Sequence, residues 1–121
     1  MQENNPCATH FSSAHIHVRR AQVDTSVIRI RGRLSKPAAG CVWRTVKAEL
    51  RRSPDLVALD LSEVSDIDAA GLGVLVSTAI CAGESDISLC LVGAREGVVG
   101  AALAKADLTE LFEIVPAGTP P

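Results

Sequence analysis

Aromatic residues are nearly absent from this sequence of 121 residues. Phe11, Trp43 and Phe112 are the only ones, and there is no tyrosine. Nucleic bases and sugars are commonly bound by stacking on aromatic rings, and a net charge of -2 gives no general attraction for a phosphate backbone. We therefore expect no direct binding to nucleic acid.

Long apolar runs are also missing. No stretch approaches the roughly 20 consecutive apolar residues of a membrane-spanning helix. The first 13 residues are polar and contain no apolar segment of the kind that a secretory signal peptide carries. These absences predict a cytoplasmic protein without membrane insertion.

The usual signatures of enzymes and metal sites do not occur. There is no G-x-S-x-G, HExxH or phosphate-binding GK[ST] motif, and the four cysteines form no CxxC pair. His15 and His17 would project from one face of a strand, but no third metal ligand is evident. We expect no catalytic residue, metal or cofactor. A redox disulfide between Cys81 and Cys90 is a less favoured alternative to buried thiols.

What the sequence does contain is enough apolar material for one folded domain. Hydrophobic residues make up 47% of the chain and charged residues 21%, the composition of an ordinary globular protein. We expect a domain over residues 14–115. Residues 1–13, which are polar, and residues 116–121, rich in Pro and Gly, are expected to be flexible ends.

Hydrophobic periodicity predicts the order of the elements. Alternation of period two predicts two strands, around residues 15–19 and 28–31, joined near Asp24. Further strands are expected at 56–61, 87–92 and 112–115, and helices at 37–52, 68–83 and 98–105. This β-β-α-β-α-β-α-β order predicts an α/β fold with a four- to five-stranded mixed sheet, mostly parallel, and crossover helices.

Two of these elements carry more specific expectations. Strand 56–61 is apolar throughout, which is typical of a central strand covered on both faces. In the helix that follows, we expect a core-facing stripe and a C-terminal cap at Gly83. The expected stripe consists of Leu72, Leu75, Val76, Ala79 and Ile80. Because binding sites in such sheets lie beyond the carboxyl ends of the strands, the expected loop at 62–73 is the candidate site.

The same segment carries a resemblance to a known family. Residues 56–75 read LVALDLSEVSDIDAAGLGVL, an apolar strand followed by Asp68-x-x-Gly71-Leu72-Gly73 at the start of a helix. With Gly32-Arg33-Leu34 and Leu91-Val92-Gly93, this resembles the STAS domains of anti-sigma factor antagonists over residues 18–115. Independently, Asp68 is expected to cap the helix, and Gly71 and Gly73 to allow close approach of another backbone.

The resemblance implies a function in binding rather than catalysis. STAS antagonists bind an anti-sigma factor, which is also a serine kinase of ATPase-like fold, and thereby release a sigma factor for transcription. The partner-binding residues implied here are Asp66, Asp68, Ala69, Ala70, Gly71 and Gly73. Whether the chain forms a homodimer is left open.

One position departs from the family pattern. The residue after the aspartate is usually a serine or threonine that the partner phosphorylates, and here it is Ala69. Alanine has no oxygen to accept a phosphoryl group, so this surface stays in its unphosphorylated electrostatic state. Ser62 and Ser65 are secondary candidates for modification.

Other functions stay open as alternatives. Related domains serve membrane transporters, so the chain is alternatively a stand-alone STAS subunit of a lipid or anion transport assembly. A third hypothesis is that the chain is a sensor of a small ligand. For the cluster of Asp60, Glu63, Asp66 and Asp68, helix capping and solvated charges are favoured over acid/base chemistry or cation binding.

Overall fold

The computed structural model describes residues 14–22 and 24–116. Both expected flexible ends lie outside these residues, apart from Pro116, and so does Cys7. Within the described part, no helix combines the length and the hydropathy needed to span a bilayer.

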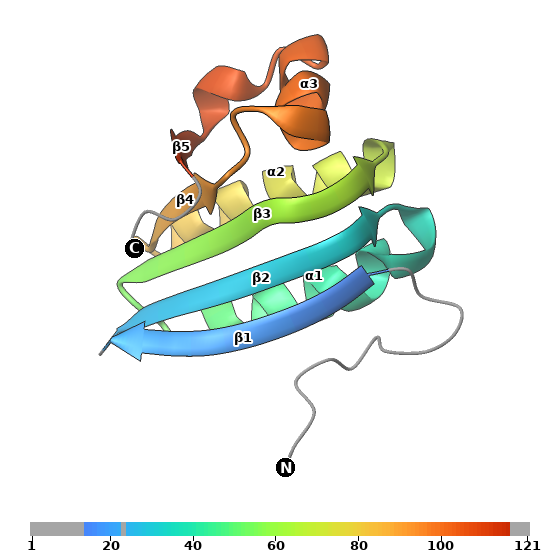
Figure 1. The fold of residues 1–121 in the computed structure, drawn as a ribbon. Helices are drawn as coiled ribbons and strands as arrows, with labels where there is room; N and C mark the ends of the chain where they lie inside the picture. The colour runs from blue at the N-terminus through green and yellow to red at the C-terminus, as the bar shows by residue number, and fades with distance from the viewer. Residues whose placement is uncertain (1–13, 23, 117–121) are drawn as a thin grey trace.

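A five-stranded mixed sheet forms the body of the structure, as expected (Figure 1). Its order is β1-β2-β3-β4-β5; β1 pairs antiparallel with β2, and the other neighbours are parallel. The strands are β1 (Ala14–Gln22), β2 (Thr25–Leu34), β3 (Leu56–Ile67), β4 (Ser88–Val92) and β5 (Glu113–Val115). The central position of β3 and the antiparallel edge addition of β1 are confirmed.

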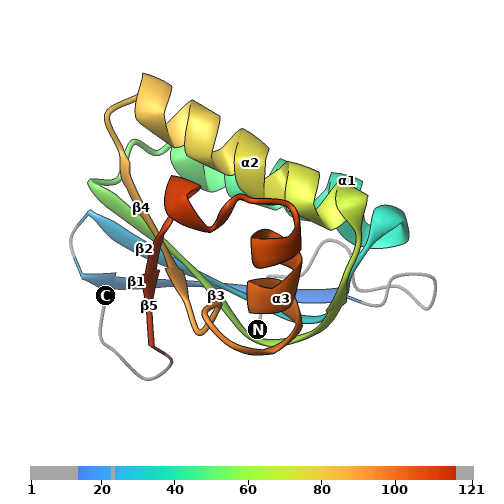
Figure 2. The ribbon, with the colours of Figure 1, turned by 90° about the horizontal axis from the view of Figure 1, so that it is seen from above.

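Three helices connect the parallel strands: α1 (Lys36–Leu50), α2 (Ala69–Glu84) and α3 (Gly97–Lys105). A short 3-10 helix at Thr109–Leu111, which the periodicity did not predict, precedes β5. Helices α1 and α2 lie side by side on one face of the sheet (Figure 2). All three helices contribute buried side chains to one core cluster, which includes Val46, Leu75 and Leu103.

The opposite face of the sheet is buried in a different way. Val57, Leu59 and Leu61 of β3 belong to the helix-covered core, whereas Ala58 belongs to a small second cluster with Val27, Cys90 and Val92. The strand is therefore buried on both faces as expected, but on the second face its buried neighbours come from adjacent strands.

Strand β3 is longer than its apolar run, and the expected loop at 62–73 is wrong. Pairing with β4 ends at Asp60, but pairing with β2 continues to Ile67 through two register shifts. The last part of β3 thus projects past β4 and has one neighbour, so most of its side chains are exposed and polar. This is why residues 62–67 lack the apolar pattern of a buried strand.

Helix α2 also differs from expectation in its rotation and its end. Its buried residues are Gly71, Val74, Leu75, Thr78 and Ala82, while Ile80 is 55% exposed. The helix continues through Gly83 and is capped at Ser85; Asp86, with a φ of 58°, supplies the left-handed residue that was expected at Gly83. Thr78 is tolerated in the core because its hydroxyl donates to the Val74 carbonyl at 2.7 Å.

Candidate functional site

Helices α1 and α2 begin at the same end of the sheet, where β2 and β3 finish (Figure 1). Asp68 joins the two helix starts. Its Oδ1 accepts a hydrogen bond from the Gly71 amide at 3.0 Å, and its Oδ2 accepts one from the Lys36 amide at 2.9 Å. The expected N-cap of α2 is thus confirmed, and the same carboxylate also satisfies a free amide at the start of α1.

The electrostatics of Asp68 follow from these contacts. The amide of Gly71, and next that of Lys36, hold the pKa of the Asp68 carboxyl below its ordinary value. Each amide stabilises the ionised form, as does the positive end of each helix dipole. Asp68 is therefore a carboxylate at neutral pH, with both oxygens directed at backbone amides.

The two glycines of the motif have different surroundings. A Cβ on Gly71 would collide with the backbone carbonyl oxygen of Leu34 and would lie 2.8 Å from Cγ1 of Ile67. A Cβ on Gly73 would meet no atom within 4 Å. The close backbone approach expected at Gly71 is therefore present, whereas Gly73 opens onto free space within this chain.

The remaining candidate residues lie around this capped helix start. Ala69 is exposed on the first turn of α2, and Ala70 is half-buried against the core. Asp66 is exposed near the end of β3, where its Oδ1 accepts from the Ile67 amide at 3.0 Å. All six candidates thus lie at the end of β3, at the N-cap and in the first turns of α2.

An uncharged stripe continues along the outer side of α2 from Ala69. The residues at helical spacing on the side opposite the buried ones are Gly73, Val76 and Ile80, and Leu72 lies at the edge of this side, where it also packs against the core. Gly73 and Ile80 are exposed, and Leu72 and Val76 are half-buried. We call the surface formed by Ala69 and these four residues the outer α2 stripe. Sequence analysis had assigned three of them to the core because the helix is apolar on every side.

The acidic side chains at the motif are not gathered into one site. Asp60 lies 3.5 Å from Arg29 and accepts two hydrogen bonds from Ser62, while Glu63 lies 2.8 Å from Arg31. Ser65 is exposed on β3. No group of three metal-ligating side chains occurs among the residues that the structure describes.

Cys81 and Cys90 lie on opposite faces of the sheet. Cys81 packs against the helix-covered core and Cys90 lies in the small cluster on the other face, so the alternative of a disulfide between them is wrong. Burial, and secondarily Glu113, raises the pKa of the Cys90 thiol. His15 and His17 are exposed on β1, on one face as predicted.

Sequence reasoning missed one participant in the site, the amide of Lys36. The sequence signal for it was Ser35-Lys36-Pro37, because proline is favoured in the first turn of a helix. The free amides at such a helix start need hydrogen-bond acceptors. That the partner comes from the next helix, 32 residues later, depends on the tertiary arrangement.

Comparison with known proteins places this geometry in context. The sequence model of a family described as "Mlab, STAS domain" matches residues 17–116. A comparison with curated proteins gives no match.

Several solved structures share the fold. An anti-sigma factor antagonist from Mycobacterium paratuberculosis has a TM-score of 0.77 at 22% identity, covering 88% of this chain and 87% of its own. The Bacillus cell fate determinant SpoIIAA in its phosphorylated form has a TM-score of 0.65 at 13% identity, covering 82% and 89%. A sulfate transporter family protein from Wolinella succinogenes has a TM-score of 0.66 at 18% identity, covering 80% of each chain.

Proposed function

The chain belongs to the STAS domain family, and from this premise we propose that it is an anti-sigma factor antagonist. Its partner is an anti-sigma factor with an ATPase-like kinase fold, and binding frees a sigma factor for transcription. The docking surface consists of Asp66, Asp68, Ala69, Ala70, Gly71 and Gly73. The protein is a binding module and not an enzyme.

One observation carries this proposal: the start of α2 is held rigidly and yet faces solvent. Asp68 fixes the first turn through the amides of Gly71 and Lys36, while Ala69 and Gly73 stay exposed beside it. A rigid surface loses little conformational entropy on binding, and the small side chains beside Asp68 need little desolvation. These are the properties of a surface for a protein partner.

Regulation by phosphorylation at this position is excluded by the alanine. A phosphoryl group there would add nearly two negative charges next to Asp68, and would oppose a partner that fits the unphosphorylated surface. Ala69 supplies neither the acceptor oxygen nor the charge. The proposed antagonist therefore binds its partner constitutively, and modification of Ser62 or Ser65 is a secondary route to control.

Calorimetric titration against the anti-sigma factors of the source cell, with and without ATP, tests the proposal. We expect dissociation constants in the micromolar range or tighter, with no change on adding ATP. Ala69→Glu introduces one negative charge at the centre of the surface and is expected to abolish binding. Glutamate is favourable in the first turn of a helix, so the variant should fold.

Ala101→Glu is the matched control, because Ala101 is an exposed alanine on α3, away from α2. This variant is expected to bind with unchanged affinity. Absence of binding to every anti-sigma factor, or equal losses in the two variants, would contradict the proposal.

The alternative is a subunit of a membrane transport assembly. It is favoured by the fold shared with the sulfate transporter family protein and by the apolar outer α2 stripe, which fits a helix of a membrane-associated subunit. Affinity purification from detergent-solubilised membranes distinguishes the two functions. Recovery of a transporter subunit, lost in Ala69→Glu, would favour the alternative.

A further inference from the structure

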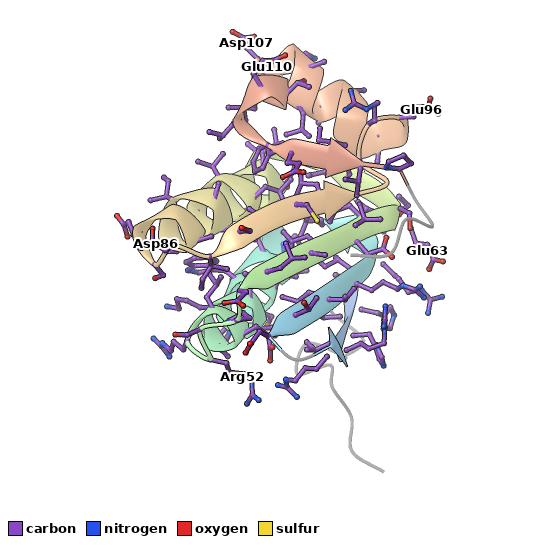
Figure 3. All side chains as sticks on the ribbon, turned by 90° about the vertical axis from the view of Figure 1, so that its left-hand side faces the viewer. Arg52, Glu63, Asp86, Glu96, Asp107 and Glu110 are labelled. Atoms are coloured by element: carbon purple, nitrogen blue, oxygen red, sulfur yellow. The ribbon has the colours of Figure 1, made fainter. Side chains whose placement is uncertain are left out.

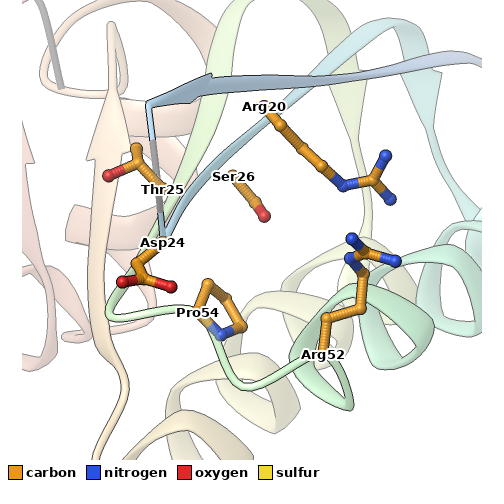
Figure 4. Close-up of a pocket in the computed structure, with 6 residues that line it drawn as sticks. All are labelled: Arg20, Asp24, Thr25, Ser26, Arg52 and Pro54. Atoms are coloured by element: carbon orange, nitrogen blue, oxygen red, sulfur yellow. The ribbon is translucent and has the colours of Figure 1, made fainter.

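A second site lies at the other end of the sheet, where β2 and β3 begin. It is a small open cavity of about 90 Å³ between the end of β1, the start of β2 and the segment after α1 (Figure 4). The lining residues are Arg20, Asp24, Thr25, Ser26, Arg52 and Pro54. The cavity is well above the roughly 10–15 Å³ that one water molecule needs, and it fits a small polar group.

One wall of this cavity is anchored by Glu49 of α1. This carboxylate is only 6% exposed and accepts hydrogen bonds from the Arg20 guanidinium at 2.7 Å and from the Ser26 hydroxyl at 3.0 Å. A charge-assisted hydrogen bond to a buried acceptor restricts a long side chain. The Arg20 guanidinium is thus held in place, although half of its side chain is exposed.

Arg52 supplies a second guanidinium with no such partner. None of the ion pairs within residues 14–22 and 24–116 includes Arg52, and its side chain turns toward that of Arg20 in the cavity (Figure 4). Each guanidinium carries five N–H donors, of which Glu49 uses one on Arg20. The cavity therefore presents a surplus of donors from two like charges.

Two other lining groups lie apart from the guanidiniums. Thr25 lines the cavity, but its hydroxyl points to the side of Asp24, away from Arg20 and Arg52 (Figure 4). The Asp24 carboxylate, the acidic group in the lining, lies on the Pro54 side of the cavity and away from the guanidiniums (Figure 4).

The surrounding charge favours an anion. Residues 14–54, which form β1, β2 and α1, contain ten lysines and arginines against two acidic residues, whereas residues 55–121 contain two against eleven. In the folded protein, acidic Glu96, Asp107 and Glu110 lie around α3, far from Arg52 (Figure 3). A positive potential concentrated on one side attracts anions to that side.

We propose that the Arg20–Arg52 cavity binds a phosphoryl group, with both guanidiniums donating to its oxygens. Phosphate oxyanions match the planar donor geometry of arginine, and Arg52, which is in no ion pair with a described residue, supplies the positive charge. The group belongs either to a soluble phosphate compound or to a lipid headgroup. This site is independent of the proposed docking surface, which lies at the opposite end of β3.

Titration with inorganic phosphate, followed by amide chemical shifts in NMR at constant ionic strength, tests the site. We expect saturable shifts centred on residues 24–26 and 52–54, with a dissociation constant near millimolar. Arg52→Gln removes one guanidinium from an exposed position and is expected to weaken binding at least fivefold. Arg44→Gln, which removes the same charge from the exposed side of α1, is the control and should leave binding within twofold.

Co-sedimentation with vesicles containing phosphatidic acid assigns the source of the phosphoryl group. Retention on these vesicles but not on phosphatidylcholine, lost in Arg52→Gln, supports a lipid headgroup; saturable phosphate shifts without retention support a soluble compound. Absence of saturable shifts together with absence of retention would overturn the proposal. Equal weakening in Arg52→Gln and Arg44→Gln would also overturn it, because binding would then follow net charge alone.

Discussion

The two ends of β3 are each organised by one carboxylate, but the two carboxylates have different partners. Asp68 accepts from two backbone amides, and Glu49 accepts from two side chains. Backbone amides carry no net charge, so the Asp68 end presents its carboxylates beside small uncharged residues. The Arg20 guanidinium keeps N–H groups that Glu49 does not use, so the Glu49 end presents arginine donors from Arg20 and Arg52. The groups that donate to each carboxylate therefore determine which ligands that end of β3 can bind.

Gly71→Ala is expected to have the largest effect on stability, because it disturbs the packing at the Asp68 end. The new Cβ would collide with the Leu34 carbonyl oxygen and force α2 away from β2. We expect a loss of about 3 kcal/mol in the free energy of unfolding, since overpacking against backbone relaxes poorly. Urea unfolding followed by circular dichroism measures it.

Gly73→Ala is the matched control for that substitution. Its Cβ would meet nothing within 4 Å, and alanine is favoured over glycine inside a helix by about 0.5–1 kcal/mol. We expect a small gain in stability. Similar losses in the two variants would show that the collision at Gly71 is not what distinguishes these positions.

Glu49→Gln is expected to have the next largest effect on stability, because it weakens the hydrogen bonds at the opposite end of β3. The amide keeps the shape of the carboxylate but leaves Arg20 without its counter-charge and places an NH₂ group among donors. Because half of the Arg20 side chain is exposed, water offsets part of the loss, and we expect about 1–2 kcal/mol.

Urea midpoints at neutral pH measure the effect of Glu49→Gln. Glu84→Gln, at an exposed position in the last turn of α2, is the control and should change stability by less than about 0.5 kcal/mol. If both variants unfold at the same urea concentration, the buried network does not anchor the cavity wall.

Asp68→Asn is expected to have the smallest effect on stability, and this effect should depend on pH. The pKa of Asp68 is lowered in the folded state, so its ionised form stabilises the fold above the unfolded-state pKa of about 3.9. That contribution is lost as the pH falls through the lower folded-state pKa. Thermal midpoints of the wild type and the variant should therefore differ at pH 6 and converge as the pH falls through the folded-state pKa. A difference that is constant with pH would contradict this role of the carboxylate.

Much of the fold could be predicted from local patterns. The order of strands and helices, the central position of β3 and the cap at Asp68 follow from periodicity and from one short polar side chain before a helix, and all are confirmed. The motif also identified Gly71 as a position of close backbone approach, although not Leu34 as the neighbour.

The errors arose where local pattern was ambiguous. Helix α2 is apolar on every side, so periodicity could not distinguish the stripe with Ile80 from the one with Val74 and Thr78. The end of β3 looked like a loop because it pairs only with β2.

The sequence by itself determined the element order, the capped start of α2, the absence of a phosphate acceptor at Ala69 and the division of charge between the two halves of the chain. These depend on residue type and on spacings of a few positions. Only the tertiary structure decided which side of α2 is buried, that Asp68 serves both helices, and that Arg20, Ser26 and Arg52 meet around one cavity beside Glu49. The hydrogen bonds among them join residues 23 to 32 positions apart, and only packing of the helices on the sheet brings these residues together.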